Sequence, residues 1–316
     1  MDAHFAELVM PTPSSHLFGA TPRLDVVARA GSLVRVRRAV YVSAEHWRPD
    51  DRAAVAILQA RAAQARASRT LVFSHVTAAR ALGLPLVGVH DDQLHVTDIA
   101  SSARRTRHGI VWHSTSTPRS VEATIEGEIT MTTPRQTALD LARSVSLVAS
   151  FIVADAVLHA SVDPAATREW WTRQLADMGP ARGSRRAATV LGLVSGLAES
   201  PLESLSLLRI HELGFEVPQQ QVELNTHRGL FRLDFGWHGG AIAGEADGRA
   251  KYGGVESIAV MEERLWREKL RYDAIREKLR TYPRWTWADA WHGGGLERAL
   301  LAAGVPRPRR PIPLSF

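Results

Sequence analysis

The pattern of apolar and polar positions in the first half of the chain predicts a small helical unit followed by helices and strands. Apolar positions predict a helix at 24–30, and the alternating side chains of LVRVRRAVYV at 33–42 predict a strand. The Ala-rich segment 50–69 predicts a helix, because its apolar residues have helical spacing and an Asp pair precedes them. The segment 71–85 predicts a short strand or turn and then a helix that ends at its Gly and Pro residues.

Further strands and a long helix complete this half. The runs DQLHVTDI at 92–99 and GIVWHSTST at 109–117 predict two strands, and GEITMTTP at 127–134 predicts a third extended segment. The sequence 134–160 predicts one long helix with a largely apolar side. Its most apolar part contains Asp155 and is too short to span a bilayer of ~30 Å, so we expect a buried helix and no membrane partner.

A loop rich in Gly and Arg, GPARGSRRAA at 179–188, predicts a domain boundary near residue 190. After it the pattern predicts the order αβββαβ, with elements at 200–214, 217–224, 230–237, 241–247, 257–280 and 281–291. We expect an α/β (α+β) fold. Its three parts are a partial winged-helix-like unit at 1–45, a mixed α/β region with a helical linker at 46–189, and a further domain at 190–316.

Composition favours a polyanionic partner and excludes some chemistry. The formal charge is +6 and the pI is about 10.2, and Lys and Arg side chains gain affinity for nucleic acid by releasing counterions from phosphates. The chain has no cysteine, which excludes disulfides, zinc–thiolate sites and a cysteine nucleophile. The first residues lack the basic and apolar regions of a secretory signal. We therefore expect a cytoplasmic protein.

The predicted strand at 33–42 carries a basic run. Arg35, Arg37 and Arg38 follow a predicted helix, as in the wing of a winged helix-turn-helix, where they would contact DNA phosphates. The alternative interpretation is a solvated strand face, which is the usual environment of a charge run.

Two strands near residue 240 bring acidic residues together. Gly239 and Gly240 separate LFRLDFGW from AIAGEAD and predict a tight hairpin, because a two-residue turn needs positive φ angles. In a hairpin centred on these glycines, Asp234 lies directly opposite Glu245 and Asp247 lies on the same side. The opposite face then carries a run of large apolar side chains: Phe231, Leu233, Phe235 and Trp237.

Acidic residues in such opposition need a compensating cation. Oxygen ligands without nearby Cys or His favour Mg²⁺ or Mn²⁺, with Asp234 and Glu245 as the metal ligands. The alternative is a salt-bridged surface hairpin with Arg232 or Arg249 as the counter-ion. The only lysines are Lys251, Lys269 and Lys278. Lys251 is the candidate to stabilise charge on a phosphate, and the alternative is a chance surface lysine.

These residues resemble the PD-(D/E)XK nuclease superfamily, and more closely its very-short-patch-repair branch, over about 198–290. The resemblance rests on SPLES with Glu203, LDF with Asp234, GEADGRAK with Glu245, Asp247 and Lys251, and the charged helix REKLRYDAIR. It implies a restriction-endonuclease-like domain in which Asp234 and Glu245 bind metal, Glu203 is an accessory acid, Lys251 is the catalytic lysine, and Lys269 and Arg271 contact DNA. The usual lysine position, two residues after Glu245, is Asp247 here.

The N-terminal half resembles the AbiEi type of antitoxin over about 16–160. The resemblance rests on LVRVRRAVYV, SHVTAARALGL and MTTPRQTALDLAR. It implies a winged-helix regulator with a second domain, operator DNA as a ligand and a toxin as a partner.

Two functions follow from these resemblances. The first is a magnesium-dependent endodeoxyribonuclease in which Glu203, Asp234, Glu245, Asp247 and Lys251 form the catalytic group. The second is an antitoxin-like DNA-binding transcriptional regulator whose nuclease fold is catalytically silent.

Overall fold

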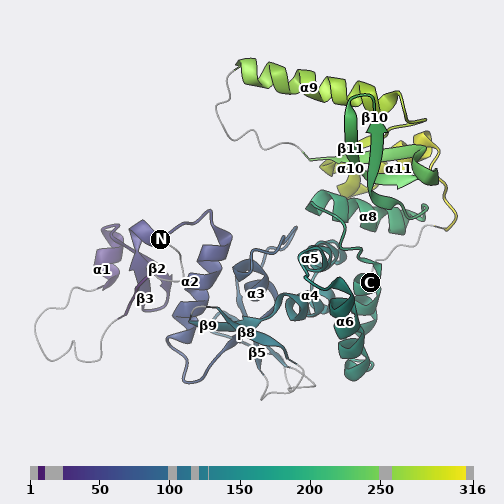
Figure 1. Ribbon diagram of the computed structural model, residues 1–316. Helices are drawn as coiled ribbons and strands as arrows, with labels where there is room; N and C mark the ends of the chain where they lie inside the picture. Colours follow the sequence, from purple (N-terminus) through teal and green to yellow (C-terminus); the bar gives the residue numbers. More distant parts are fainter. Residues whose placement is uncertain are drawn as a thin grey trace, which may run out of the picture. The chain divides into compact units, whose positions relative to one another are not determined.

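The computed structural model describes residues 6–10, 24–98, 105–114, 121–126, 128–248 and 258–310. It contains helices and several sheets, which confirms the predicted mixed α/β class (Figure 1). The chain forms two compact units. The first comprises Met1–Val157 and Ala165–Leu191, and the second comprises Leu158–Pro164 and Gly192–Phe316.

A small sheet with the order β1-β3-β2 begins the first unit. Its elements are β1 (Leu8–Val9), α1 (Leu24–Arg29), β2 (Leu33–Arg37), β3 (Val40–Ser43), the 3-10 helix η2 (Ala44–His46) and α2 (Arg52–Gln64). The single strand predicted at 33–42 is instead an antiparallel hairpin, and Ala39 between its strands has a φ of 58°. Asp51 caps α2 by accepting a hydrogen bond from the amide of Ala54 at 2.9 Å.

A six-stranded sheet with the order β6-β7-β5-β4-β9-β8 follows. Its elements are β4 (Val72–Phe73), α3 (His75–Ala81), β5 (Leu94–Asp98), β6 (Arg105–Arg107), β7 (Ile110–Ser114), β8 (Ala123–Glu126) and β9 (Ile129–Thr132). Sequence reasoning missed β6 and β8. All three residues of β6 are exposed, so its pattern lacks the alternation that identifies a half-buried strand. The apolar side chains of β4, β5 and β9 form a core with α2 and α3.

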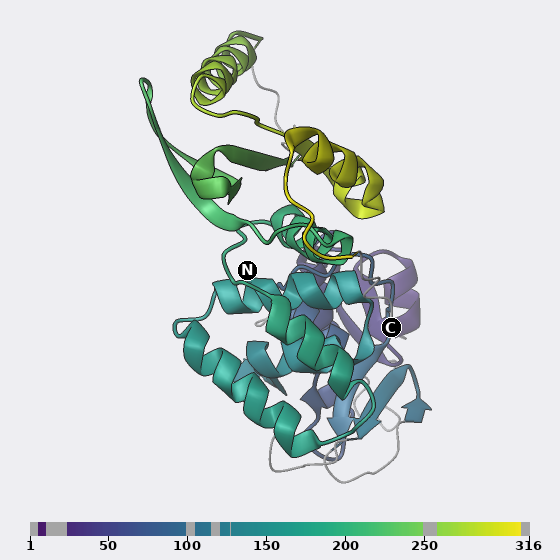
Figure 2. The ribbon, with the colours of Figure 1, turned by 90° about the vertical axis from the view of Figure 1, so that its right-hand side faces the viewer.

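Four helices complete the described part of the first unit: α4 (Pro134–Ser144), α5 (Leu147–His159), α6 (Pro164–Met178) and α7 (Ser184–Leu193). Figure 2 shows them in teal, grouped on one side of this unit. The one long helix predicted at 134–160 was wrong, because α4 ends at Ser144 and Val145 is extended. Phe151 and Ile152 of α5 are fully buried, as predicted. Among the described helices, none is long and apolar enough to cross a membrane.

The second unit begins with the predicted order αβββαβ and continues with two helices that were not predicted, the first of which starts within the strand expected at 281–291. Its elements are α8 (Pro201–Leu213), β10 (Gln219–Thr226), β11 (Gly229–Trp237), the 3-10 helix η4 (His238–Gly240), β12 (Ile242–Asp247), α9 (Ile258–Arg276), β13 (Arg284–Thr286), α10 (Trp287–His292) and α11 (Gly294–Ala303). The sheet order is β10-β11-β12-β13, with β12 and β13 parallel and the other pairs antiparallel. Figures 1 and 2 show the long hairpin of β10 and β11 between α8 and α9.

The hairpin of β11 and β12 has the predicted register but a different turn. Phe235 pairs with Gly244 and Trp237 pairs with Ile242, so the next positions on the two strands are Asp234 and Glu245. The connection between the strands runs from 238 to 241 and includes a 3-10 turn, rather than a two-residue turn. Gly239 and Gly240 have φ angles of 63° and 91°, which glycine adopts at low cost.

Candidate functional site

Three of the predicted acidic residues gather in the second unit. Asp234 lies on β11, Glu245 on β12, and Glu203 in the first turn of α8. Glu203 and Glu245 are each 7% exposed, whereas Asp234 is half-buried. Burial, together with the negative charges of Glu203 and Glu245, raises the pKa of Asp234 to about 7. Glu203 and Glu245 therefore both repel the charged form of Asp234, and the sequence analysis expected this repulsion from Glu245 but not from Glu203.

Glu203 takes part in the N-terminal capping motif of α8, whose N-cap residue is Ser200. Its Oε1 accepts a hydrogen bond from Ser200 Oγ at 2.8 Å, and its Oε2 accepts one from the backbone amide of Glu199 at 2.9 Å. The Glu203 amide in turn donates to Ser200 Oγ at 3.2 Å. The side chain of Gln221 donates to Oε2 at 2.9 Å. The S-x-x-E signature of SPLES therefore has a structural explanation as a capping motif.

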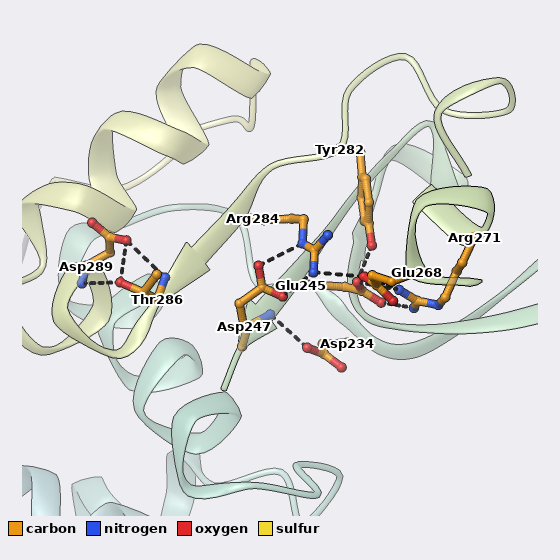
Figure 3. Close-up of polar contacts among 10 residues, drawn as sticks. Asp234, Glu245, Asp247, Glu268, Arg271, Tyr282, Arg284, Thr286 and Asp289 are labelled. Atoms are coloured by element: carbon orange, nitrogen blue, oxygen red, sulfur yellow. Dashed lines mark hydrogen bonds and ion pairs between the residues drawn. The ribbon is translucent and has the colours of Figure 1, made fainter. Parts of the chain in front are cut away.

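Glu245 is neutralised within the protein. Arg271 of α9 approaches both carboxylate oxygens of Glu245, with one hydrogen bond of 3.0 Å, and the hydroxyl of Tyr282 also donates to this carboxylate. The ion pair raises the pKa of Arg271, and burial together with the Glu245 contact raises the pKa of Tyr282. Figure 3 shows Arg271 and Tyr282 converging on Glu245. A buried carboxylate with these donors is electrostatically satisfied.

Asp247 has its own arginine. Arg284 of β13 donates two hydrogen bonds of 2.7 Å to the two carboxylate oxygens of Asp247. The same guanidinium lies 3.0 Å from Glu268 of α9, as Figure 3 shows. Sequence reasoning missed both Arg284 and Tyr282. Arg284 lies beside the carboxylates because β13 pairs in parallel with β12, where Arg284 is opposite Glu245.

The arrangement realises the alternative of a salt-bridged hairpin, with different partners from those expected. The counter-ions are Arg271 and Arg284, whereas Arg232 pairs with Glu199. Arg249 lies outside the described residues, and so does Lys251, the predicted catalytic lysine. Within the described ranges, no group of three or more His, Cys, Asp or Glu residues is arranged to hold a metal ion.

Asp234 differs from Glu245 and Asp247, because no arginine among the described residues forms an ion pair with its carboxylate. Its carboxylate accepts a hydrogen bond of 2.8 Å from the amide of Ala246 on the adjacent strand. The charge of Arg271 lowers its pKa, but burial and the two neighbouring glutamates outweigh this effect. A proton or another cation at Asp234 would relieve the repulsion.

The predicted DNA contacts of the first unit lie on the β2–β3 hairpin. Arg35 and Arg38 are exposed, and Arg37 is half-buried. Arg37 donates to the carbonyl oxygen of His108 at 2.8 Å, and His108 lies in the turn between β6 and β7. Arg107 of β6 is exposed beside this turn. The hydrogen bond between Arg37 and His108, which are 71 residues apart in the sequence, thus joins two arginine-bearing hairpins.

Two further arginines of the first unit, both missed by the sequence analysis, pair with a buried acid. Arg105 of β6 and Arg69 lie 2.8 and 3.0 Å from the buried carboxylate of Asp98. Their guanidinium groups lie 5.2 and 5.4 Å from the ring centre of Trp112. The run ARRTRH, which contains Arg105 and Arg107, lies between the strands predicted at 92–99 and 109–117, and its basic residues are the signal that could have pointed to this hairpin.

The predicted DNA contacts of the second unit have different environments. Lys269 is exposed on α9, and its Nζ lies 5.4 Å from the ring centre of Trp266. Arg271 is half-buried and bound to Glu245. Lys269 is therefore the more accessible of the two cations.

Comparison with known proteins supports one of the two resemblances. The family model for the AbiEi antitoxin C-terminal domain matches residues 75–193. This match begins at α3, covers strands β5 to β9 of the six-stranded sheet and ends with α7.

Two curated relatives match most of the chain. Both are named as uncharacterized proteins of Mycobacterium tuberculosis, one from strain CDC 1551 / Oshkosh and one from strain ATCC 25618 / H37Rv. Each is 27% identical over 259 residues, covering 81% of this chain and 86% of the relative. The similarity therefore extends beyond the region that the family model matches.

Proposed function

We propose that this protein is an antitoxin-like DNA-binding regulator, and that the acidic residues of its second unit are catalytically silent. The similarity of residues 75–193 to the AbiEi antitoxin C-terminal domain carries this proposal. The joined arginine hairpins give the regulator a surface for DNA. A toxin is the partner that the same similarity suggests.

The DNA surface combines exposed and fixed cations. Arg35, Arg38 and Arg107 are exposed and would bind phosphates. Arg37 would act mainly as a positioning residue, because its guanidinium is bound to the carbonyl of His108. This division predicts that loss of an exposed arginine weakens DNA binding without unfolding the unit.

The test is binding to duplex DNA from the region upstream of the protein's own gene, with a scrambled duplex as the reference. Fluorescence anisotropy over a range of salt concentrations gives the affinity and the salt slope. Each of Arg38→Ala and Arg107→Ala should reduce the slope by about 0.9 if it removes one phosphate contact. Arg173→Ala is the matched control, because this arginine is 64% exposed on α6, away from both hairpins in the sequence. Unchanged binding by both hairpin variants would contradict the proposed surface.

The internal ion pairs of the second unit support the proposal that it is catalytically silent. Arg271 and Arg284 occupy the carboxylates of Glu245 and Asp247. A divalent ion would therefore have to compete with arginines that already form short hydrogen bonds. The reading frame next to the gene for this protein gives a simple test for a partner. A nucleotidyltransferase-like toxin gene at that position would favour the regulator proposal over the nuclease.

Metal-dependent hydrolysis of DNA is the second candidate, and the repulsion around Asp234 favours it. Asp234 and Glu245 would hold Mg²⁺ or Mn²⁺, with Glu203 as an accessory acid and Asp247 and Lys251 in supporting roles. A bound Mg²⁺ would supply an activated water and stabilise charge on the phosphate. Glu245 would contribute only after release from Arg271.

Cleavage of supercoiled plasmid with Mg²⁺ or Mn²⁺ tests this second candidate. An active enzyme should lose cleavage in Asp234→Asn and retain it in Asp273→Asn, a matched change at an exposed residue of α9. Equal cleavage by the wild type and both variants would assign the activity to a contaminant. Absence of cleavage, combined with salt-dependent DNA binding, would leave the regulator as the supported function.

A further inference from the structure

The first unit contains a pocket of about 400 Å³ that neither proposed function uses. Residues of α3, β5, β7 and α4 line it, together with Met178 and Arg182. This size is in the range of pockets that bind small organic ligands. The pocket lies within the region similar to the AbiEi antitoxin C-terminal domain.

Three histidines form one wall of the pocket. His95 Nδ1 lies 2.8 Å from His113 Nε2, and His95 Nε2 lies 3.0 Å from a carboxylate oxygen of Asp91. The rings of His75 and His113 are stacked, with centroids 3.5 Å apart and an interplanar angle of 12°. The wall therefore presents flat imidazoles held by one another and by Asp91.

Asp140 is a buried acid at the same pocket. It lies on α4, is 7% exposed, and accepts a hydrogen bond from Gln136 Nε2 at 2.9 Å through Oδ1. Its other oxygen, Oδ2, is fully buried and has no hydrogen-bond partner among the described residues. His75 Nδ1 is 3.9 Å from Oδ2, which is beyond hydrogen-bond distance. Buried acceptors are nearly always satisfied, so Oδ2 points to a missing donor.

The surroundings of Asp140 restrict the kind of donor. The guanidinium of Arg143 donates to the carbonyl oxygen of Arg182 at 3.1 and 3.3 Å. His95 and His113 direct ring nitrogens toward each other, and the described residues offer no grouping with metal-binding geometry. A compact metal ion therefore fits the pocket less well than a ligand with N–H groups. A planar cation would in addition stack on the imidazole wall.

We propose that this pocket binds a small planar cation of the amidinium or guanidinium class, which donates N–H hydrogen bonds to Asp140 Oδ2 and packs against the histidine wall. Asp91 supplies a second carboxylate at the pocket. The same chemical group occurs in free small molecules and in arginine side chains of peptides, and these two sources can be distinguished with separate probes.

Isothermal titration of the full-length protein with three probes tests the proposal. Methylguanidinium and benzamidine represent free ligands, and N-acetyl-arginine amide represents an arginine within a peptide. Saturable binding of a free probe is expected, and tighter binding of the arginine amide than of methylguanidinium would assign the site to a peptide. The titrations contain no DNA, so their result is independent of the regulator proposal.

Variants and a control cation make the result decisive. Asp140→Asn should weaken binding by about tenfold or more, because a charged hydrogen bond is lost. Asp50→Asn removes the same charge from an exposed position of the first unit and should leave the affinity unchanged.

Tetramethylammonium, which carries a positive charge but no N–H donor, should not bind. This last measurement needs no variant, so it remains informative if Asp140→Asn fails to fold. Equal affinity for tetramethylammonium, equal affinity in Asp140→Asn, or no saturable binding of any probe would overturn the proposal.

Discussion

Each unit contains an aspartate with a pKa near 7, but the physical causes differ. In the first unit, burial alone raises the pKa of Asp140, while the hydrogen bond from Gln136 and the charge of Arg143 lower it. In the second unit, burial acts on Asp234 together with repulsion from Glu203 and Glu245. Asp140 thus has one oxygen, Oδ2, without a donor among the described residues, whereas Asp234 is repelled by two neighbouring glutamates.

The two units therefore differ in how the surrounding residues compensate the charge of a buried carboxylate. The second unit places Arg271 and Arg284 on Glu245 and Asp247, so that its remaining repulsion is concentrated at Asp234. In the first unit, Oδ2 of Asp140 is buried beside a pocket and has no hydrogen-bond partner among the described residues. The charged form of Asp234 is favoured when the negative charge around it is reduced. The charged form of Asp140 is favoured when a ligand donates a hydrogen bond to its Oδ2. Four experiments separate these cases.

The largest effect is expected from Arg271→Ala. This change leaves the buried carboxylate of Glu245 without its arginine and should destabilise the second unit by about 3–5 kcal/mol. Hydrogen exchange of the β11 and β12 amides measures this loss in the second unit alone. The control Arg267→Ala, on the same helix, removes an exposed pair with Glu263 and should cost about 0.5 kcal/mol. Similar losses in the two variants would show that Arg271 is not the compensating charge.

Asp140→Asn should have a strongly pH-dependent effect on the first unit. The folded pKa of about 7 exceeds the ordinary value of 3.8, so the folded protein binds the proton more tightly than the unfolded chain does. Stability therefore falls as the pH rises from about 4 to 7. The variant should remove this penalty and gain about 2–4 kcal/mol at pH 8 relative to pH 4. Urea unfolding of the wild type and the variant at both pH values measures the gain. A pH-independent difference would contradict the raised pKa.

Tyr282→Phe should have a smaller effect in the second unit. It removes the hydroxyl that donates to Glu245 but retains Arg271, so we expect a loss of about 1–2 kcal/mol. Tyr272→Phe is the matched control, because its ring lies 5.6 Å from that of Tyr282. Thermal unfolding compares the two hydroxyl deletions. Equal shifts would argue against a specific Tyr282–Glu245 contact.

The smallest change is expected from Glu203→Gln. Glutamine retains an acceptor for the α8 cap but removes one negative charge near Asp234, so the pKa of Asp234 should fall. The pKa of Asp140 should not change, because Glu203 is not among the groups that shift it. NMR titration of the aspartate carboxyl signals measures both groups in one sample. A constant pKa at Asp234 would mean that burial and Glu245 raise it without a contribution from Glu203.

The sequence by itself determined the local elements and one long-range register. The Asp51 and Ser200 caps, the αβββαβ order and the placement of Asp234 opposite Glu245 follow from neighbouring residues, since side-chain period and turn position are local properties. It did not identify β6, whose residues are all exposed, or the break after α4.

Only the tertiary structure decided which groups meet the acidic residues. Arg271 and Tyr282 reach Glu245 from 26 and 37 residues away, and Arg37 reaches His108 across 71 residues. The pocket at Asp140 likewise combines residues of two strands and three helices. The pairing of Glu245 with Arg271 has no local sequence signature, and neither has the Asp140 oxygen without a hydrogen-bond partner among the described residues. Both depend on how separate helices and strands pack together.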